Sequence, residues 1–525
     1  MKKFAIIFVS AALTALSLMF TPTSFLAWFS LAPFIYIIIA ESEKKKNPVK
    51  IYFTGLLWSF LYYFVIYHWF TYLYPMEFME VSKLEAVGII AVCWIGLSFL
   101  QAIGTAFVPL VFRLTAKHKF LYPLLFASVW TLFEWLQTLT WMGVPWARLA
   151  LSQAPFPIFI QSASLFGSLF VSFIIVLVNG YIACAAYEFK KQFINVRSIR
   201  IYAGMAAAVF IANALFGATA LLLHQNDESR KINALLVQGN ISSGEKWNQE
   251  TSPLDLYISL SYEGVENSKD PIDIIVWPET VINYYMLGKD AEVEQTLKLA
   301  ADTGAVVFAG TLDYKKPDIY NSIIAFYPNG SIDEHPYYKR HLVPFGEYLP
   351  MRDFISQFIP ALADLNMLGD DLTAGTDSQV TKAAGGMVGR IICFDSIYEE
   401  LSRKSVADGA EIIILSTNDS WYLDSSAVYQ HNRHAVLRAV ENNRWVLRAA
   451  NTGISSMISS DGKVTDFLEP LVQGNVTGKA YFSSSRTLYS YIGDSFVILC
   501  AAVICTEAAF GVVKKIMLKK KSKSS

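Results

Sequence analysis

Cysteine is scarce in this chain, with five residues among 525. Four of them lie in long apolar runs, and Cys393 is the single cysteine of the more polar stretch 224–487. A segment with one thiol cannot form an internal disulfide, and Cys393 lacks the closely spaced cysteine or histidine partners of a zinc site. His431 and His434 stand at i and i+3, but the sequence shows no third ligand near them. We therefore predict neither a disulfide nor a metal site, which leaves Cys393 as an inert packed thiol or a nucleophile.

Charge is also sparse, since only 17% of the residues are charged and the net charge is −1. Hydrophobic residues make up 54% of the chain and the mean hydropathy is +0.36, which is too apolar for an ordinary soluble protein. No basic stripe interleaves with aromatic residues outside the flanks of the apolar runs, so nucleic-acid binding is not expected. The sequence has no Gly-x-Ser-x-Gly motif, and this argues against a serine hydrolase.

What the chain does contain is apolar runs of membrane-spanning length, which is about 20 residues for a helix. Allowing for ragged ends, eight runs qualify, and they cover residues 4–20, 25–40, 51–74, 86–112, 120–141, 158–187, 201–223 and 492–513. Glu134 lies inside the fifth run, where an ionisable group is expected to be either functional or paired. Residues 1–20 also have the composition of a signal peptide, and the charge pattern does not decide between a cleaved segment and a first span.

Basic residues mark one side of the membrane. They precede the first run and follow the second, fourth, sixth and eighth, at Lys2, Lys3, Lys44, Lys45, Lys46, Lys50, Arg113, Lys117, Lys119, Lys190, Lys191, Arg197, Arg200 and the lysines after 513. Every basic loop thus falls on the same side, which the positive-inside rule makes cytoplasmic. We predict a seven-span bundle over 1–223, an extracytoplasmic domain over 224–487, and a C-terminal span with a basic tail over 488–525.

Within 224–487, short Ile/Val-rich runs alternate with polar helical segments, a pattern typical of an α/β domain. Glu279 ends the run IIVWPE, Cys393 ends GRIIC, and Asn418-Asp419 ends IIILSTND. Catalytic groups commonly lie at the carboxyl ends of such strands. With Lys339, these residues supply a base, a nucleophilic thiol and a cation that can stabilise a thiolate or an oxyanion.

The order of these three residues resembles the Glu-Lys-Cys triad of the nitrilase (carbon–nitrogen hydrolase) superfamily, and the whole chain resembles the apolipoprotein N-acyltransferase family. The segments that carry the resemblance are GVPWARLALSQ (143–153), VQGNISSGEKW (237–247), WPET (277–280), YYKRHLVPFGEYLP (337–350), RIICFD (390–395), STNDSWY (416–422) and HAVLRAVENNRWVLRAANTGISSMISSDG (434–462). The resemblance implies a polytopic helical membrane bundle of about eight spans joined to an αββα sandwich on the extracytoplasmic side of the inner membrane.

The resemblance also implies roles for individual residues. Glu279 would be the general base, Lys339 the oxyanion-stabilising cation and Cys393 the nucleophile. Glu347 matches an additional active-site glutamate, and Trp247 either lines the lipid site or simply packs.

The implied reaction is acyl transfer from a phospholipid, with phosphatidylethanolamine as the expected donor, through a Cys393 thioester. The acceptor would be the α-amino group of the diacylglyceryl-cysteine that begins an apolipoprotein. No cofactor or metal is needed, and we expect a monomer. The alternative function is that of a membrane-tethered amidase acting on small C–N substrates.

The chain departs from the family beside the thiol. The family usually has Cys-Tyr-Glu, whereas this chain has Cys393, Phe394 and Asp395. Phe394 lacks the phenol hydroxyl, and Asp395 keeps the charge on a side chain that is one methylene shorter. We also note an amphipathic stretch, 353–372, which either dips into the membrane interface and gates the site or forms a packed connection.

Overall fold

The computed structural model describes residues 2–76, 81–191, 194–242, 253–282, 290–358 and 371–521. The chain divides into two compact units. The helical unit comprises Met1–Phe70, Gly88–Leu223 and Ile492–Ser525, and the α/β unit comprises Thr71–Val87 and His224–Tyr491. The segment Thr71–Val87 therefore groups with the α/β unit, whereas the sequence assigned it to the N-terminal bundle.

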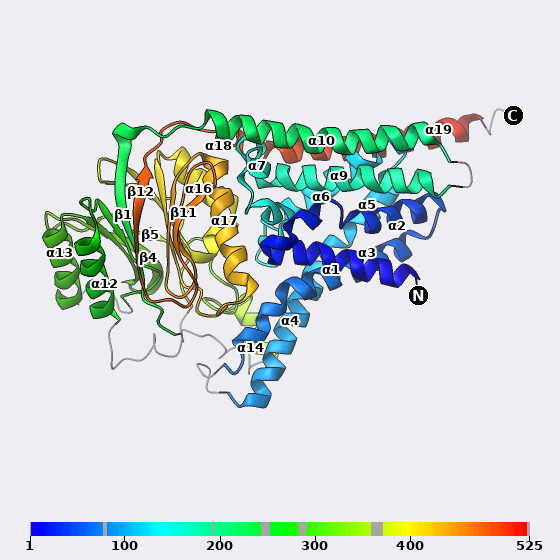
Figure 1. Ribbon diagram of the computed structural model, residues 1–525. Coiled ribbons are helices and arrows are strands. Elements are labelled where there is room, and N and C mark those ends of the chain that lie inside the picture. Colours follow the sequence, from blue (N-terminus) through cyan, green and yellow to red (C-terminus); the bar gives the residue numbers. More distant parts are fainter. Residues whose placement is uncertain are drawn as a thin grey trace. The chain divides into compact units, whose positions relative to one another are not determined.

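Long apolar helices make up the helical unit (Figure 1). Its main helices are α1 (Lys2–Met19), α2 (Ala32–Glu43), α3 (Pro48–Ile66), α4 (Lys83–Thr105), α5 (Phe107–Thr115), α6 (Tyr122–Leu136), α9 (Ser168–Phe189), α10 (Val196–Leu223) and α19 (Ser495–Lys521). Among the described residues, seven helical segments are long and apolar enough to cross a membrane. The fifth predicted run is not one of them, because α6 has 15 residues and so extends only about 22 Å.

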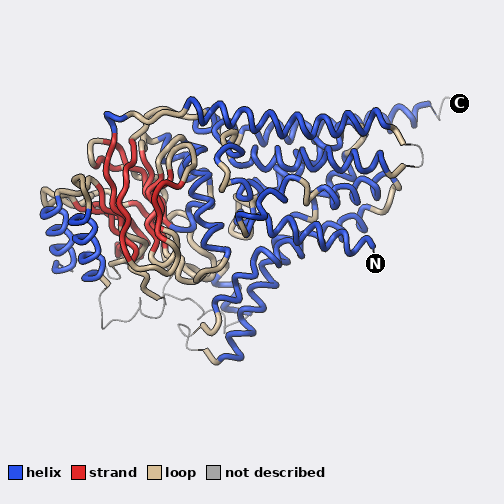
Figure 2. The backbone as a smooth tube through the Cα atoms, viewed as in Figure 1, coloured by secondary structure: helices blue, strands red, loops and turns tan. Residues whose placement is uncertain are grey.

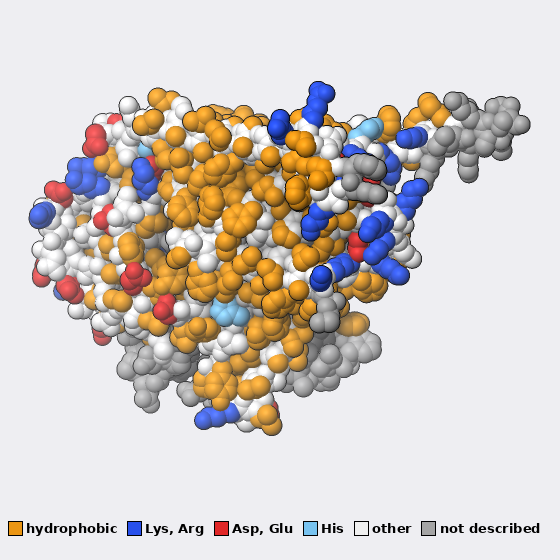
Figure 3. All heavy atoms as spheres, turned by 45° about the vertical axis from the view of Figure 1, so that its right-hand side comes forward, with side chains coloured by type: hydrophobic (Ala, Val, Ile, Leu, Met, Phe, Trp, Pro, Cys, Tyr) orange, Lys and Arg blue, Asp and Glu red, His pale blue; other side chains and the backbone are white. Residues whose placement is uncertain are grey.

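The surface of the helical unit fits a lipid environment. Large apolar side chains stand exposed along its helices, including Val92, Leu215 and Ile498, which are 63–72% exposed. Figure 3 shows hydrophobic side chains spread over this surface and lysine and arginine side chains gathered at one end of the unit. An apolar surface of this size on a folded unit marks an interaction with membrane or protein, and the apolar helices here favour membrane.

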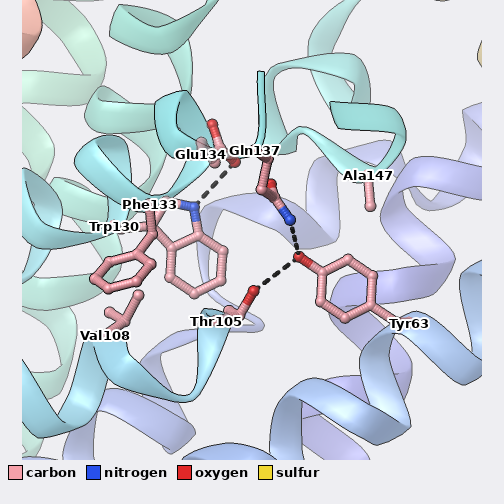
Figure 4. Close-up of a pocket in the computed structure, with 8 residues that line it drawn as sticks. All are labelled: Tyr63, Thr105, Val108, Trp130, Phe133, Glu134, Gln137 and Ala147. Carbon is pink, nitrogen blue, oxygen red and sulfur yellow. Dashed lines mark hydrogen bonds between the residues drawn. The ribbon is translucent and has the colours of Figure 1, made fainter. Parts of the chain in front are cut away.

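Glu134 of α6 is paired inside the helical unit. Its Oε1 accepts hydrogen bonds from the indole N–H of Trp130 and the backbone N–H of Leu149, each at 3.0 Å, and its Oε2 lies 4.0 Å from Nε of Arg148. Figure 4 shows Trp130 and Glu134 beside a small cavity that Tyr63 and Gln137 also line. Buried ionisable groups in an apolar bundle need such partners, and of the two readings of Glu134 the structure supports pairing.

Two six-stranded sheets form the centre of the described α/β unit (Figure 2). The first has the order β12-β1-β2-β3-β4-β5, with β12 (Gly474–Tyr481), β1 (Lys231–Gln238), β2 (Ile274–Val276), β3 (Val306–Lys315), β4 (Asp318–Phe326) and β5 (Tyr337–Tyr338). The second has the order β11-β10-β9-β8-β7-β6, with β11 (Val464–Leu468), β10 (Ser455–Ile458), β9 (Val446–Ala450), β8 (Ile412–Thr417), β7 (Gly386–Ile392) and β6 (Thr381–Ala383). The strands β1, β2 and β3 are parallel to one another, and so are β7, β8 and β9.

Alternating side chains of the strands build two apolar cores. Leu236 of β1 packs in a core that also holds residues of the other sheet, such as Ile414 of β8. Its neighbour Leu235 faces the opposite way and packs with residues of α12 (Leu254–Asn267) and α13 (Asp290–Thr303). This alternation is the two-residue period of a strand, and here both faces are apolar because both are covered.

Helices cover the outer faces of both sheets. The helices α12 and α13 lie outside the first sheet, and α16 (Glu399–Ala407) and α17 (Ser426–Asn442) lie outside the second (Figure 1). The unit is thus a four-layer αββα sandwich, as the sequence predicted. The carboxyl ends of its parallel strands meet in one region, where the polar residues singled out above are found.

Candidate active site

Glu279, Lys339 and Cys393 follow three different strands, and the fold brings them together. Glu279 stands three residues after β2, Lys339 directly after β5, and Cys393 directly after β7. They are 6%, 1% and 9% exposed. Lys339 is largely apolar in its stem but ends in a cation, so its near-complete burial requires compensating charges.

Two carboxylates supply that compensation. Nζ of Lys339 donates to Oε1 of Glu279 at 2.9 Å and to Oε1 of Glu347 at 2.8 Å. The other oxygen of Glu347 accepts from the backbone N–H of Val343 at 2.8 Å, which fixes that side chain in its own loop. Glu347, which the sequence associated with the site, therefore lies in direct contact with Lys339.

Asn321 of β4 also belongs to the cluster, and the sequence analysis missed it. Its Nδ2 donates to Oε1 of Glu279 at 2.7 Å and to Oε1 of Glu347 at 3.1 Å, the same two oxygens that Lys339 binds. An amide donor between two carboxylates holds them close without adding a charge. Nothing in the strand-like run NSIIAFY distinguished this asparagine from an ordinary strand residue.

The charges around Cys393 favour the protonated thiol in the resting site. Burial raises the pKa of Cys393 and the negative charge of Glu279 raises it further, while Lys339 and a hydrogen bond from Thr417 oppose them. Burial also acts against the Lys339 ammonium, but Glu279 and Glu347 outweigh it and hold the pKa of Lys339 well above its usual value. The pKa of Glu347 is raised by burial and by Glu279. A neutral thiol beside a carboxylate base is the arrangement that general-base activation of a nucleophile requires.

Cys393 begins a sharp turn. It is the first residue of the 3₁₀-helix η8 (Cys393–Ile397) and has φ +48°, in the left-handed region that residues other than glycine and asparagine seldom adopt. Such a conformation costs on the order of 1–3 kcal/mol and persists only where neighbours hold it. The turn lifts the thiol out of the line of β7 at the end of the sheet.

Asp395 ties this turn to the segment that carries Lys339. Its Oδ2 accepts from the hydroxyl of Tyr337 at 2.8 Å and from the backbone N–H of Ile392 at 3.1 Å. Its Oδ1 accepts from the backbone N–H groups of Arg340 at 3.2 Å and His341 at 2.8 Å. The carboxylate is fully buried and all its contacts come from donors, so the shorter side chain suits this site.

The Phe394 side chain contributes packing rather than a hydrogen bond. It is 8% exposed and packs edge-on against Tyr398, with the ring centroids 5.6 Å apart. A phenylalanine makes this contact through its ring alone.

Behind the thiol lies a second buried group, formed by Asp419, His431 and Arg448. The sequence had singled out Asp419 as a strand end and His431 as a candidate metal ligand, with His434, for which no third ligand was evident. Cys393, Asp419 and His431 each offer one ligand atom, and these atoms lie within 4.8 Å of one another. Asp419 and His431, however, are in direct hydrogen-bond contact at 2.7 Å, and Asp419 also pairs with Arg448 at 2.8 Å. The candidate ligand atoms of Asp419 and His431 already bond to each other, so the geometry suits an ion-pair network better than a metal site.

Two of the sequence-based interpretations fall partly or wholly outside the described residues. Trp247 lies outside the described residues, and so do residues 359–370 of the amphipathic stretch. The helix α14 (Arg352–Phe358) covers the beginning of this stretch, with Phe354 57% exposed. Arg352 forms an ion pair with Asp371 at 2.5 Å, so the two ends of the stretch lie together.

Comparison with known proteins agrees with this architecture. Residues 234–474 match the carbon–nitrogen hydrolase family, and residues 10–181 match the apolipoprotein N-acyltransferase N-terminal domain. An apolipoprotein N-acyltransferase of Geobacter metallireducens is 27% identical over 523 residues, covering 97% of this chain and 95% of the relative. That of Brucella melitensis is 31% identical over 388 residues, covering 71% of this chain and 70% of the relative. Among solved structures, an amidase from Nesterenkonia sp. is 15% identical with a TM-score of 0.38, covering 50% of this chain and 94% of the amidase.

Proposed function

Since the chain belongs to the apolipoprotein N-acyltransferase family, we propose that it moves an acyl chain from a membrane phospholipid to the α-amino group of the N-terminal diacylglyceryl-cysteine of an apolipoprotein. The observation that carries the proposal is the buried contact of Lys339 with Glu279 beside Cys393, in a chain whose described residues include seven apolar helical segments of membrane-spanning length. A thiol, a base and a cation are the parts of a covalent acyl transfer, and the apolar helices support a membrane location for the protein, where both lipid substrates are found.

The first half of the reaction loads the enzyme. Glu279 takes the thiol proton of Cys393, and the sulfur attacks the carbonyl carbon of the phospholipid ester. Lys339 stabilises the negative charge that develops on the carbonyl oxygen. The C–O bond then breaks, Glu279 returns its proton to the departing alcohol, and a lysophospholipid leaves behind an acyl thioester on Cys393.

The second half of the reaction transfers the acyl chain from Cys393 to the acceptor. The neutral α-amino group of the acceptor attacks the thioester carbon and gives a proton to Glu279 as the C–N bond forms. When the C–S bond breaks, that proton returns to the Cys393 sulfur, so the enzyme regains its starting state with an amide as product. No electrons are gained or lost, and the same base and cation serve both halves.

Three finer features belong to the same proposal. The acyl donor is phosphatidylethanolamine, and the protein acts as a monomer. The α/β unit faces the extracytoplasmic side of the inner membrane, which is supported by the basic residues that follow alternate apolar runs.

The test is acyl transfer by the purified full chain. The protein is mixed with phosphatidylethanolamine and a synthetic diacylated lipopeptide, and the peptide mass is followed by mass spectrometry. We expect a gain of one acyl chain with the wild type and none with Cys393→Ala. Hydrolysis of a short amide without acylation of the lipopeptide would instead establish the alternative amidase function.

A further inference from the structure

The turn that begins at Cys393 has a buried support formed by Asp419, His431 and Arg448. His431 of α17 and Asp419 after β8 are 1% and 0% exposed, and Arg448 of β9 is also fully buried. Buried charges of this kind are costly unless they are paired and hydrogen-bonded with good geometry.

The ring of His431 is fixed from one edge. Its Nδ1 lies 2.7 Å from Oδ1 of Asp419, and the other oxygen of Asp419 accepts from Arg448 at 2.8 Å. Burial would raise the pKa of Asp419, but the charges of Arg448 and His431 outweigh it and hold that pKa below its usual range. An ionised carboxylate can only accept, so the 2.7 Å contact places a proton on Nδ1 and sets the orientation of the ring.

The opposite edge of the ring points at the nucleophile's backbone. Nε2 of His431 lies 3.1 Å from the carbonyl oxygen of Cys393 and 3.0 Å from Oγ of Ser396. The Ser396 hydroxyl also donates to that carbonyl oxygen at 2.8 Å. A carbonyl oxygen only accepts, so the ring bonds both Asp419 and this carbonyl only when both of its nitrogens carry a proton. In that form the carbonyl of Cys393, a residue with φ +48°, accepts from two side chains, Ser396 of its own turn and His431 of α17.

We propose that His431 is a positioning residue for Cys393, oriented by Asp419 and Arg448, and that it acts with Ser396 to hold the nucleophile's backbone in its left-handed turn. The inference rests on the proposed function only in taking Cys393 as the nucleophile. Its consequence is kinetic, because a displacement of a reacting atom by about 1 Å can cost on the order of 100-fold in rate. A residue that acts only through the backbone of Cys393 should change the rate and leave the Michaelis constants near their wild-type values.

Two substitutions of His431 separate positioning from bulk structure. His431→Asn places an amide near the Nδ1 position, toward Asp419, and cannot reach the Cys393 carbonyl. His431→Gln carries its amide nitrogen to about the Nε2 position and can donate to that carbonyl. The two variants thus remove opposite edges of the same buried ring.

The measurement is the rate of acyl-enzyme formation with phosphatidylethanolamine vesicles and no acceptor, together with the melting temperature of each variant. We expect His431→Asn to form the thioester about 10- to 100-fold more slowly than the wild type, with KM changed less than about twofold. His431→Gln should recover a substantial part of the rate. Equal rates in the two variants, or rates that only follow the loss of folded protein, would overturn the proposal.

Ser396→Ala keeps the test decisive where the His431 variants do not fold. This change removes the second contact to the Cys393 carbonyl and leaves the His431–Asp419 pair in place. We expect thioester formation to slow by more than any loss of folded protein explains, and a wild-type rate would overturn the proposal. A wild-type protein that forms no acyl-enzyme at all would contradict the proposed function instead, so the two failures can be told apart.

Discussion

Asp395→Asn is the substitution for which the structure predicts the most definite outcome. The aspartate accepts four hydrogen bonds, two on each oxygen, and three of the donors are backbone N–H groups. An asparagine has one acceptor oxygen and one NH₂ group, which can only donate. One pair of donors must therefore face another donor in a fully buried site.

The size of the loss depends on which way the amide turns. If its NH₂ takes the Oδ1 position, the N–H groups of both Arg340 and His341 lose their acceptor. If it takes the Oδ2 position, only Ile392 does, because the Tyr337 hydroxyl can rotate and accept. The side chain will adopt the second arrangement, which leaves one buried donor unsatisfied at a cost of about 1–3 kcal/mol.

Thermal unfolding and thioester formation report this cost. For a unit of this size, 1–3 kcal/mol corresponds to a fall in Tm of about 2–10 °C. Because Asp395 joins the Lys339 segment to the Cys393 turn, the rate of thioester formation should fall as well. Asp424→Asn is the matched control, since Asp424 is an exposed aspartate of the same unit, and its Tm and rate should stay at wild-type values. Wild-type Tm and rate for Asp395→Asn would refute the role assigned to this carboxylate.

Three further predictions follow from single contacts. Asn321→Asp would set a third carboxylate against Glu279 and Glu347, and three carboxyl groups so close together cannot all ionise. Thioester formation should slow by at least about tenfold, and a wild-type rate would contradict the bridging role of Asn321. Burial and Glu279 raise the pKa of Cys393, so alkylation of Cys393 by iodoacetamide, read by peptide mass spectrometry, should keep rising about tenfold per pH unit through pH 9; a plateau below pH 8 would show a preformed thiolate. Glu134→Ala leaves the buried Arg148 without its carboxylate and should lower Tm by several degrees. Glu134→Gln still accepts hydrogen bonds from Trp130 and Leu149 and should lower Tm less. Equal falls in Tm would contradict a stabilising role for these contacts of Glu134.

Much of the fold could be predicted because its signals are local. Apolar runs and the lysines beside them predict a membrane bundle from composition alone, and the Ile/Val-rich runs of 224–487 correspond to β1, β2, β7 and β8. The position of Glu279 and Cys393 at strand ends was also visible, because a polar residue that closes an apolar run is a local pattern. The short length of α6 could not be predicted, because the run of apolar residues continues beyond Leu136, where the helix ends.

The parts of the site that escaped prediction depend on contacts between distant segments. Asn321 lies in an ordinary strand pattern, and its function in the cluster arises only when the fold brings β4 within hydrogen-bond distance of Glu279, three residues beyond β2. His431 was visible, but it was considered only as a possible metal ligand together with His434, for which no third ligand was evident. Its partners are Asp419 and the Cys393 carbonyl, and no periodicity connects them. Asp395 similarly looked like a weakened substitute until its four donors were known.

The central claim is that Cys393 carries the acyl chain between the two substrates. The most direct test incubates the full chain with phosphatidylethanolamine in the absence of acceptor, digests it at low pH, and identifies the modified peptide by mass spectrometry. The account predicts one acyl group on Cys393, released by neutral hydroxylamine and transferred when the diacylated lipopeptide is added. Lipopeptide acylation by a protein that never carries a hydroxylamine-sensitive acyl group on Cys393, or that retains activity as Cys393→Ala, would contradict it.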